Sequence, residues 1–237
     1  MNKIRFRPGI WFTMLMLPLA LVFALLGKWQ LNREQQKSQL VEQFQAAPEF
    51  SWREVDQDTP RFSRILGQGR FDPVRHVLLD NRVFNGQPGV HVFTPFKFND
   101  GRQVLVNRGW LPLPPDRQPP GLETPAGPVS LAGRLNPPPR VGRRLGEAQS
   151  LNPATWPNLV TYLELSLISE ALGMELDSRI ILLAAAHPAG FQDRDWSPVN
   201  FGPEKNRAYA LQWFALALTV IVVYLVVGSQ RQQEVSG

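Results

Sequence analysis

The chain has 237 residues, of which 43% are hydrophobic, and this excludes a wholly disordered protein. It contains no cysteine, which excludes disulfides, thiolate metal sites and cysteine nucleophiles. The net charge of +5 does not indicate nucleic-acid binding, because residues 38–200 carry 16 Lys and Arg against 17 Asp and Glu, and the basic surplus flanks two apolar stretches.

The first uncharged stretch, Pro8 to Gly27, is long enough to cross a membrane at about 1.5 Å per residue. Three basic residues precede it and predict a cytoplasmic N-terminal tail over residues 1–9. We interpret residues 10–27 as an uncleaved transmembrane helix. A buried helix of a soluble protein is one alternative. A cleaved signal peptide is another, although its cleavage site, Val22-Phe23-Ala24, would lie inside the apolar run.

Trp29, Gln30 and Arg33 follow this stretch, in the sequence LLGKWQLNREQQK. Trp29 and Arg33 are four residues apart and would share one face of a continuous helix. Trp and Arg are common at headgroup depth, so an interfacial belt explains these two residues without a site. A belt does not explain Gln30, because an amide at this depth is costly unless it is paired. A contact site for a partner or ligand is therefore the second interpretation.

The region between the two apolar stretches, residues 28–207, is predicted to be a β-rich periplasmic domain with one short helix, so the fold class is a membrane protein with an α+β extramembrane domain. The connection after the first strand contains Asn85-Gly86 and Pro88-Gly89, and Asn99-Asp100-Gly101 predicts a hairpin turn. Runs of strand-forming residues predict strands over 75–82, 89–98, 102–110, 129–135 and 178–185.

Two other segments of this region have clear local signals. Seven prolines between Pro112 and Pro128 indicate an extended, non-helical excursion inside the domain. Leu163 to Gly173 has apolar residues at helical spacing and a glycine that could end a helix.

The second uncharged stretch, Ala208 to Gln230, predicts a transmembrane helix over 208–228 and a cytoplasmic tail over 229–237. Tyr209, Gln212 and Trp213 fall on one face of this helix, where it enters the bilayer from the outer side. Both predicted spans therefore bring Trp and Gln to the same depth. We expect Gln30 and Gln212 to pair with each other, with another protein or with a ligand.

Few residues suggest catalysis. His76, His91 and His187 have no metal-ligand spacing, and the sequence has no nucleophile elbow or phosphate-binding glycine loop. Asp80 and Asp100 are interpreted as solvated acids at strand ends. The sequence therefore predicts neither an enzyme nor a metal site, although a catalytic pair of residues distant in sequence is an alternative.

Four motifs occur in a fixed order between and beside the two stretches: LGKWQLNR, DNRVFNGQPGVHVFTP, VNRGWLP and YALQWFALA. Together they resemble the surfeit-locus (Surf/Shy) family of cytochrome c oxidase assembly proteins, from about Leu26 to Leu218. The resemblance implies an assembly factor, or chaperone, without catalytic turnover, which supports haem a delivery to, or retention in, the catalytic subunit of the oxidase.

The resemblance also implies partners and a location. The partners are the catalytic subunit and the lipid bilayer, with no nucleic acid; no cofactor is required, and haem a is a transient cargo. The chain has no Arg- and Ser-rich presequence, which favours the inner (cytoplasmic) membrane of a bacterium. A membrane-tethered periplasmic enzyme and a structural subunit of a respiratory complex are the alternatives.

One position departs from the family pattern. The segment KNRAYALQWF has Asn206 where the resemblance leads us to expect a histidine, and Asn is a poor axial ligand for haem iron. His187, in a predicted loop, is a weak substitute. For Asn107 and Arg108, a strand-terminating turn is an equal alternative to a site. The predicted partner- or haem-contacting residues are Trp29, Gln30, Arg33, Asn107, Arg108, Trp110, Tyr209, Gln212 and Trp213.

Overall fold

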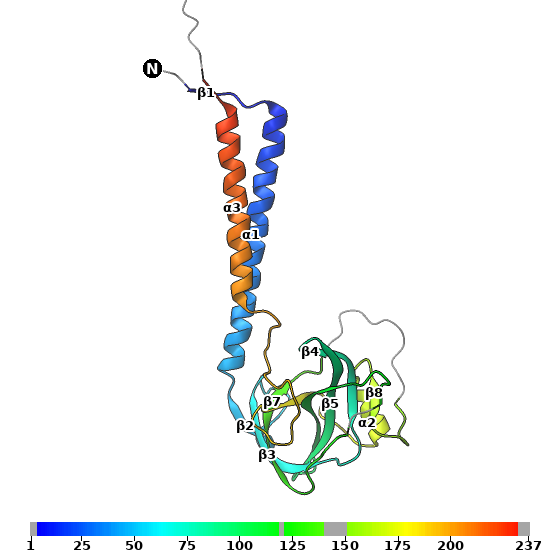
Figure 1. Cartoon of the computed structure of the whole chain (residues 1–237). Coiled ribbons are helices and arrows are strands. Elements are labelled where there is room, and N and C mark those ends of the chain that lie inside the picture. The colour runs from blue at the N-terminus through cyan, green and yellow to red at the C-terminus, as the bar shows by residue number, and fades with distance from the viewer. Residues whose placement is uncertain (1–3, 119–120, 140–150, 232–237) are drawn as a thin grey trace, which may run out of the picture. The chain divides into compact units, whose positions relative to one another are not determined.

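The computed structural model describes residues 4–118, 121–139 and 151–231. They form two units: a helical unit, with the described residues up to Glu42 and from Ser197 onward, and a barrel domain from Gln43 to Trp196. Two apolar helices thus flank a β-rich domain, which confirms the predicted fold class (Figure 1). The elements are β1 (Ile4–Phe6), α1 (Ile10–Gln45), β2 (Glu49–Ser51), the 3-10 turn η1 (Trp52–Glu54), β3 (Arg64–Phe71), β4 (Val77–Phe84), β5 (Gln87–Phe98), β6 (Gln103–Pro112), β7 (Val129–Asn136), β8 (Asn158–Val160), α2 (Leu165–Leu172), β9 (Ile180–Leu183), α3 (Pro203–Gly228) and β10 (Ser229–Arg231).

Helices α1 and α3 lie side by side in the helical unit (Figure 1). Both are long and apolar enough to cross a membrane, and only 11% of the most apolar segment of each is buried. A core helix of a soluble protein would be mostly buried, so the exposed apolar surface favours contact with lipid. At about 1.5 Å per residue α1 is about 54 Å long, well beyond a hydrocarbon core of about 30 Å. Its polar C-terminal half therefore continues past the apolar segment.

Small residues let α1 and α3 approach each other closely. Ala20 and Gly27 on α1 are buried, as are Ala210 and Ala217 on α3. A Cβ atom at Gly27 would lie 2.8 Å from the ring of Phe214, so a larger side chain would separate the helices. Packing of this kind is typical of helices that associate in a membrane, where burial of apolar surface provides little driving force.

The barrel domain is built on one eight-stranded sheet in the order β2-β3-β7-β9-β6-β5-β4-β8. Strand β3 pairs with both β7 and β5, so the five strands β3, β7, β9, β6 and β5 form a closed ring. Gly69 is the residue of β3 that pairs with both neighbours, opposite Val129 of β7 and Phe98 of β5. A Cβ atom there would lie 2.1 Å from the carbonyl oxygen of Lys97, so the closure of the barrel requires glycine.

Alternation along the strands separates two hydrophobic cores. In β6, Val104 and Val106 belong to a core with residues of β3, β5, β7 and β9, whereas Leu105 belongs to a second core. That second core also contains Ile168 and Leu172 of α2. The period of two therefore places alternate residues in the cluster shared by the ring strands and beneath α2.

The predicted strands, the helix and both turn signals at Asn85-Gly86 and Asn99–Gly101 are confirmed. Asn85 and Gly86 have φ of 49° and 76°, as a two-residue hairpin turn of type I′ requires. Gly173 ends α2 in the left-handed conformation, with φ of 63°. Residues 113–118 and 121–128 contain no helix or strand, as the prolines predicted.

Other expectations were wrong. Pro88-Gly89 does not belong to the connection but to β5, where the pair faces Val83 and Arg82 of β4. Asp80 is not a solvated acid: it is buried and forms an ion pair with Arg117. Strands β2, β3 and β8 were not predicted, and neither were β1 and β10, which pair with each other at residues assigned to the two terminal tails.

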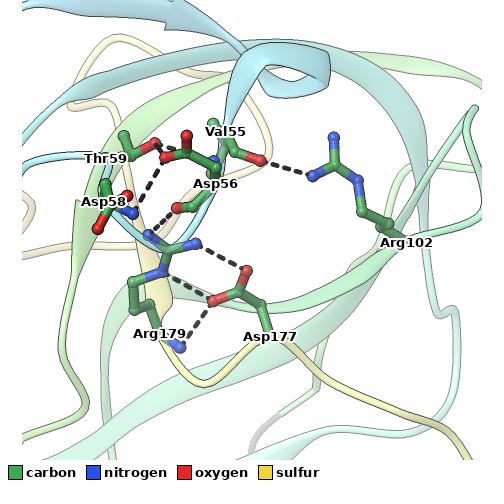
Figure 2. Close-up of polar contacts among 7 residues, drawn as sticks. All are labelled: Val55, Asp56, Asp58, Thr59, Arg102, Asp177 and Arg179. Atoms are coloured by element: carbon green, nitrogen blue, oxygen red, sulfur yellow. Dashed lines mark hydrogen bonds and ion pairs between the residues drawn. The ribbon is translucent and has the colours of Figure 1, made fainter.

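Hydrogen bonds from Arg102 and Arg179 connect the segment at Val55 and Asp56, which precedes β3, to the rest of the barrel domain (Figure 2). Arg102 donates from Nη1 to the carbonyl oxygen of Val55 at 2.8 Å, and Arg179 donates to that of Asp56 at 2.8 Å. Arg179 also donates from Nε and Nη2 to the two carboxylate oxygens of Asp177, at 2.9 and 3.0 Å. This hydrogen-bonded carboxylate raises the pKa of Arg179. These arginines hold the loop around Val55 and Asp56 in place, so their role is structural.

Candidate functional site: a groove on the helical unit

The residues predicted to contact a partner or haem fall in two places. Six of them lie in the helical unit and three lie in the barrel domain, so each group is described within its own unit. In the helical unit they are Trp29, Gln30, Arg33, Tyr209, Gln212 and Trp213, and in the barrel domain they are Asn107, Arg108 and Trp110.

Asn206 joins α3 to α1 through both ends of its amide. Its Nδ2 donates to Oε1 of Gln30 at 2.7 Å, and its Oδ1 accepts from Nζ of Lys37 at 2.7 Å. Residues 30 and 37 are two helical turns apart and therefore lie on one face of α1. Arg207 adds an ion pair with Glu34, which lies between them, at 2.8 Å. The position where the family resemblance predicts histidine is thus part of a polar bridge between the helices.

This bridge answers the question raised by Gln30. Its amide oxygen is paired with Asn206, and not with Gln212, among the residues that the structure describes. Gln212 is exposed on α3. The two glutamines therefore differ in role: one stabilises the helix pair and the other remains accessible to lipid or protein.

An open groove of about 510 Å³ lies beside the bridge, and we call it the α1 groove. Trp29 is 52% exposed there, and the guanidinium carbon of Arg33 lies 5.9 Å from the centre of its ring, so the two share a helix face as predicted. Lys37 was not among the predicted contact residues, although its spacing of four residues from Arg33 could have indicated it. The groove is lined by Trp29, Arg33, Gln36, Lys37, Leu40 and Asn206.

The predicted residues of α3 differ in exposure. Tyr209 is 53% exposed, and Gln212 is also exposed. Trp213 is partly buried against Phe23 of α1, with ring centres 5.6 Å apart. Trp213 therefore contributes to helix packing, whereas Tyr209 and Gln212 face the surroundings.

In the barrel domain, Arg108 is only 1% exposed. Its guanidinium donates to the carbonyl oxygens of Ala189 and Glu123 and to the hydroxyl of Thr124. Burial, and secondarily the charge of Arg194, lower the pKa of Arg108 to about 10. The positive charge is thus stabilised by neutral oxygens, which tie the segments around 123 and 189 to β6.

Asn107 and Trp110 are also buried. The Asn107 amide donates from Nδ2 to Nδ1 of His91, 3.1 Å away, and Trp110 donates from Nε1 to the carbonyl oxygen of Arg82 at 3.2 Å. Strand β6 continues through this motif to Pro112, so the strand-terminating turn that was an alternative is wrong. Gly109 instead bends the strand, with φ of 106°. These side chains have internal partners, and their contact with another protein stays a prediction.

The three histidines all lie in the barrel domain, and each has hydrogen-bond partners. His187 donates from Nε2 to the carbonyl oxygen of Ser130 at 3.0 Å and accepts at Nδ1 from the backbone of Ala189 at 3.1 Å. Both ring nitrogens are therefore used, which disfavours His187 as a haem ligand. Nδ1 of His76 lies 2.9 Å from the hydroxyl of Thr94. Within the described residues, no group of three or more His, Asp or Glu could hold a metal ion.

The sequence of this chain is similar to those of known proteins. The model of the SURF1 family matches residues 17–218, which include most of both apolar helices and the whole barrel domain. A SURF1-like protein of Rickettsia felis is 25% identical over 85% of this chain and 89% of its own length. A SURF1-like protein of Monosiga brevicollis is 31% identical over 54% of this chain and 53% of its own. An uncharacterized SURF1-like protein of Mycobacterium bovis is 30% identical over 54% of this chain and 52% of its own. The chain therefore belongs to the SURF1 family, which is associated with cytochrome c oxidase assembly.

Proposed function

We propose that this protein is an assembly factor, or chaperone, for cytochrome c oxidase that acts on the catalytic subunit and supports delivery or retention of haem a during biogenesis. The observation that carries the proposal is the family match across both helices and the barrel domain. The α1 groove supports it, because an exposed tryptophan beside two cations is the composition of a protein-contact hot spot.

The proposed location is the inner membrane of a bacterium, with two spans and the barrel domain on the periplasmic side. The basic residues before α1 support this orientation. A reporter that is active only outside the cytoplasm should be active when it is inserted between Pro112 and Pro128 and inactive when it is fused after Gly237. An active C-terminal fusion would contradict the orientation.

Haem a is proposed as a transient cargo rather than as a resident group. At position 206 the residues do not fit an iron ligand: both ends of the Asn206 amide are hydrogen bonded to α1, and the sequence places no histidine in either helix. We propose that the protein supports haem a insertion through contact with the catalytic subunit. Asn206 would then hold the helices together and present the α1 groove.

Deletion of the gene tests this function. Membranes from the deletion strain should lose oxidase activity and haem a absorbance, and a plasmid copy of the gene should restore both. Co-purification separates the alternatives, because a structural subunit accompanies mature oxidase in equal amount whereas an assembly factor accompanies immature forms. Unchanged oxidase in the deletion strain would contradict the proposal.

A further inference from the structure

We propose that the α1 groove binds the phosphate of an anionic phospholipid headgroup through Arg33 and Lys37, with Trp29 at the edge of the hydrocarbon layer. The inference rests on the membrane anchoring of α1 and not on the proposed role in oxidase assembly. It makes the groove a lipid site as well as a candidate surface for protein contact.

Two positively charged side chains line the α1 groove. Arg33 and Lys37 both line it, and neither forms an ion pair with any residue in the part of the chain that the structure describes. Arg33 donates from Nη1 to the amide oxygen of Gln36 at 3.2 Å, and Lys37 donates to Asn206 at 2.7 Å. Both partners are neutral, and a guanidinium and an ammonium each have further N–H groups to donate. The two positive charges therefore have no anionic partner among the described residues, and a phosphate could serve as one.

The positions of Arg33 and Lys37 along α1 place their charges near the headgroup layer. The apolar stretch ends at Gly27, and Arg33 follows it by six residues, or about 9 Å along the axis. The headgroup layer on each side of a bilayer is about 5–8 Å thick, and helical side chains tilt toward the N-terminus, which here is the direction of the membrane. Arg33 thus reaches the headgroup layer, and Lys37 lies one turn farther out, where it can approach a phosphate from the aqueous side.

The aromatic side chain of Trp29 favours a lipid as the source of the phosphate. Trp29 lies two residues beyond Gly27 and is 52% exposed, with the guanidinium carbon of Arg33 5.9 Å from the ring centre. Exposed tryptophan at this depth favours the membrane interface. The guanidinium lies near the indole, so a lipid phosphate bound by Arg33 would have its acyl chains beside Trp29. A free phosphate ion would gain nothing from the indole, which favours a lipid as the source.

Lipid competition on the reconstituted full-length protein tests the site. Spin-labelled phosphatidylglycerol and phosphatidylcholine would be compared in phosphatidylcholine bilayers by electron paramagnetic resonance, which gives the relative association constant. The wild type should prefer phosphatidylglycerol, and Arg33→Gln should lower that preference about fivefold. Arg33→Lys keeps the charge and should retain most of the preference. Higher salt should weaken the preference in the wild type.

The matched control is Lys28→Gln, which removes the same charge next to Trp29 from an exposed residue that does not line the groove. It should change the preference less than about twofold. Arg33→Gln leaves the bonds of Asn206 to Gln30 and Lys37 intact, so a loss of preference with unchanged helix content reports on the site rather than on folding. Equal losses in Arg33→Gln and Lys28→Gln, or no preference in the wild type, would overturn the proposal.

Discussion

In the barrel domain the guanidinium of Arg108 is buried among carbonyl and hydroxyl oxygens, whereas in the helical unit the guanidinium of Arg33 is exposed beside Trp29. The two sequence motifs look alike, since each combines Asn, Arg and Trp within a few residues. In VNRGW all three side chains are buried and have partners inside the domain. In GKWQLNR the Trp and Arg line an open groove. Similar composition therefore serves internal structure in one unit and surface contact in the other, and only burial distinguishes them.

The largest difference between the two units should appear in stability. Arg108→Ala leaves the carbonyl oxygens of Ala189 and Glu123 without their donors, so it should lower the free energy of unfolding by about 3 kcal/mol. Arg33→Ala, the matched control, should change it by less than about 0.5 kcal/mol. Denaturant unfolding of the detergent-solubilised full chain, followed by near-UV circular dichroism, measures both. Equal losses would show that the two arginines do not differ in role.

The second largest effect should depend on pH through His91. Burial, and secondarily Arg82, lower its pKa from 6.5 to about 4, although Asp193 opposes this shift. Below pH 6.5 the unfolded chain therefore binds a proton that the folded chain does not take up until about pH 4. Stability of the barrel domain should be full above pH 7 and should fall between pH 6.5 and 4, by at most about 3 kcal/mol.

His91→Gln is the control for this prediction. It removes the titrating group, so the slope of unfolding free energy against pH should become smaller between pH 6.5 and 4. His76, whose pKa is also lowered by burial, should keep part of the slope in the variant. An unchanged slope would show that His91 does not carry the effect.

The sequence predicted the elements whose signals are local and missed those that depend on tertiary contact. Alternation and turn residues identified β4 to β7, β9 and α2, and apolar length identified the two long helices. Strand β3 was missed because Gly67 and Gly69 interrupt its pattern, yet Gly69 is required where the strand changes partners. The same limit applies to the site. Helical spacing placed Trp29 beside Arg33, but only the packing of α3 against α1 brings Asn206 to Gln30 and Lys37.

A smaller effect is expected at Asn206, in the polar bridge of the helical unit. Asn206→Leu should weaken the association of α1 and α3 by about 1 kcal/mol, because it removes two interhelical hydrogen bonds.

Asn206→His tests whether position 206 can hold a haem ligand. Wild-type protein purified from haem a-producing cells should carry little haem, and the variant should carry more, with a Soret band typical of histidine ligation. Stoichiometric haem a in the wild type would contradict haem a as a transient cargo and would mean that a residue other than Asn206 serves as the ligand.

Substitutions in the α1 groove should have the smallest effect on the stability of the protein and the largest effect on its function, because they should reduce oxidase assembly. In the deletion strain, Trp29→Ala and Arg33→Ala should leave the protein's abundance in membranes nearly normal, because both side chains are exposed. Trp213→Ala should reduce oxidase assembly as well, with some loss of abundance, because Trp213 packs against Phe23. Trp11, which is 82% exposed on α1 and lies outside the groove, provides the matched control Trp11→Ala.

Oxidase activity and haem a absorbance, each divided by the abundance of the protein in the same membranes, give the most direct test of the groove as the working surface of an assembly factor. Loss of a hot-spot tryptophan typically costs about 2 kcal/mol, or about 30-fold in affinity for a partner. The normalised oxidase signal should therefore fall to less than about a third in Trp29→Ala and stay at the wild-type level in Trp11→Ala. A normal signal in Trp29→Ala would contradict the account, as would a loss explained entirely by lower abundance.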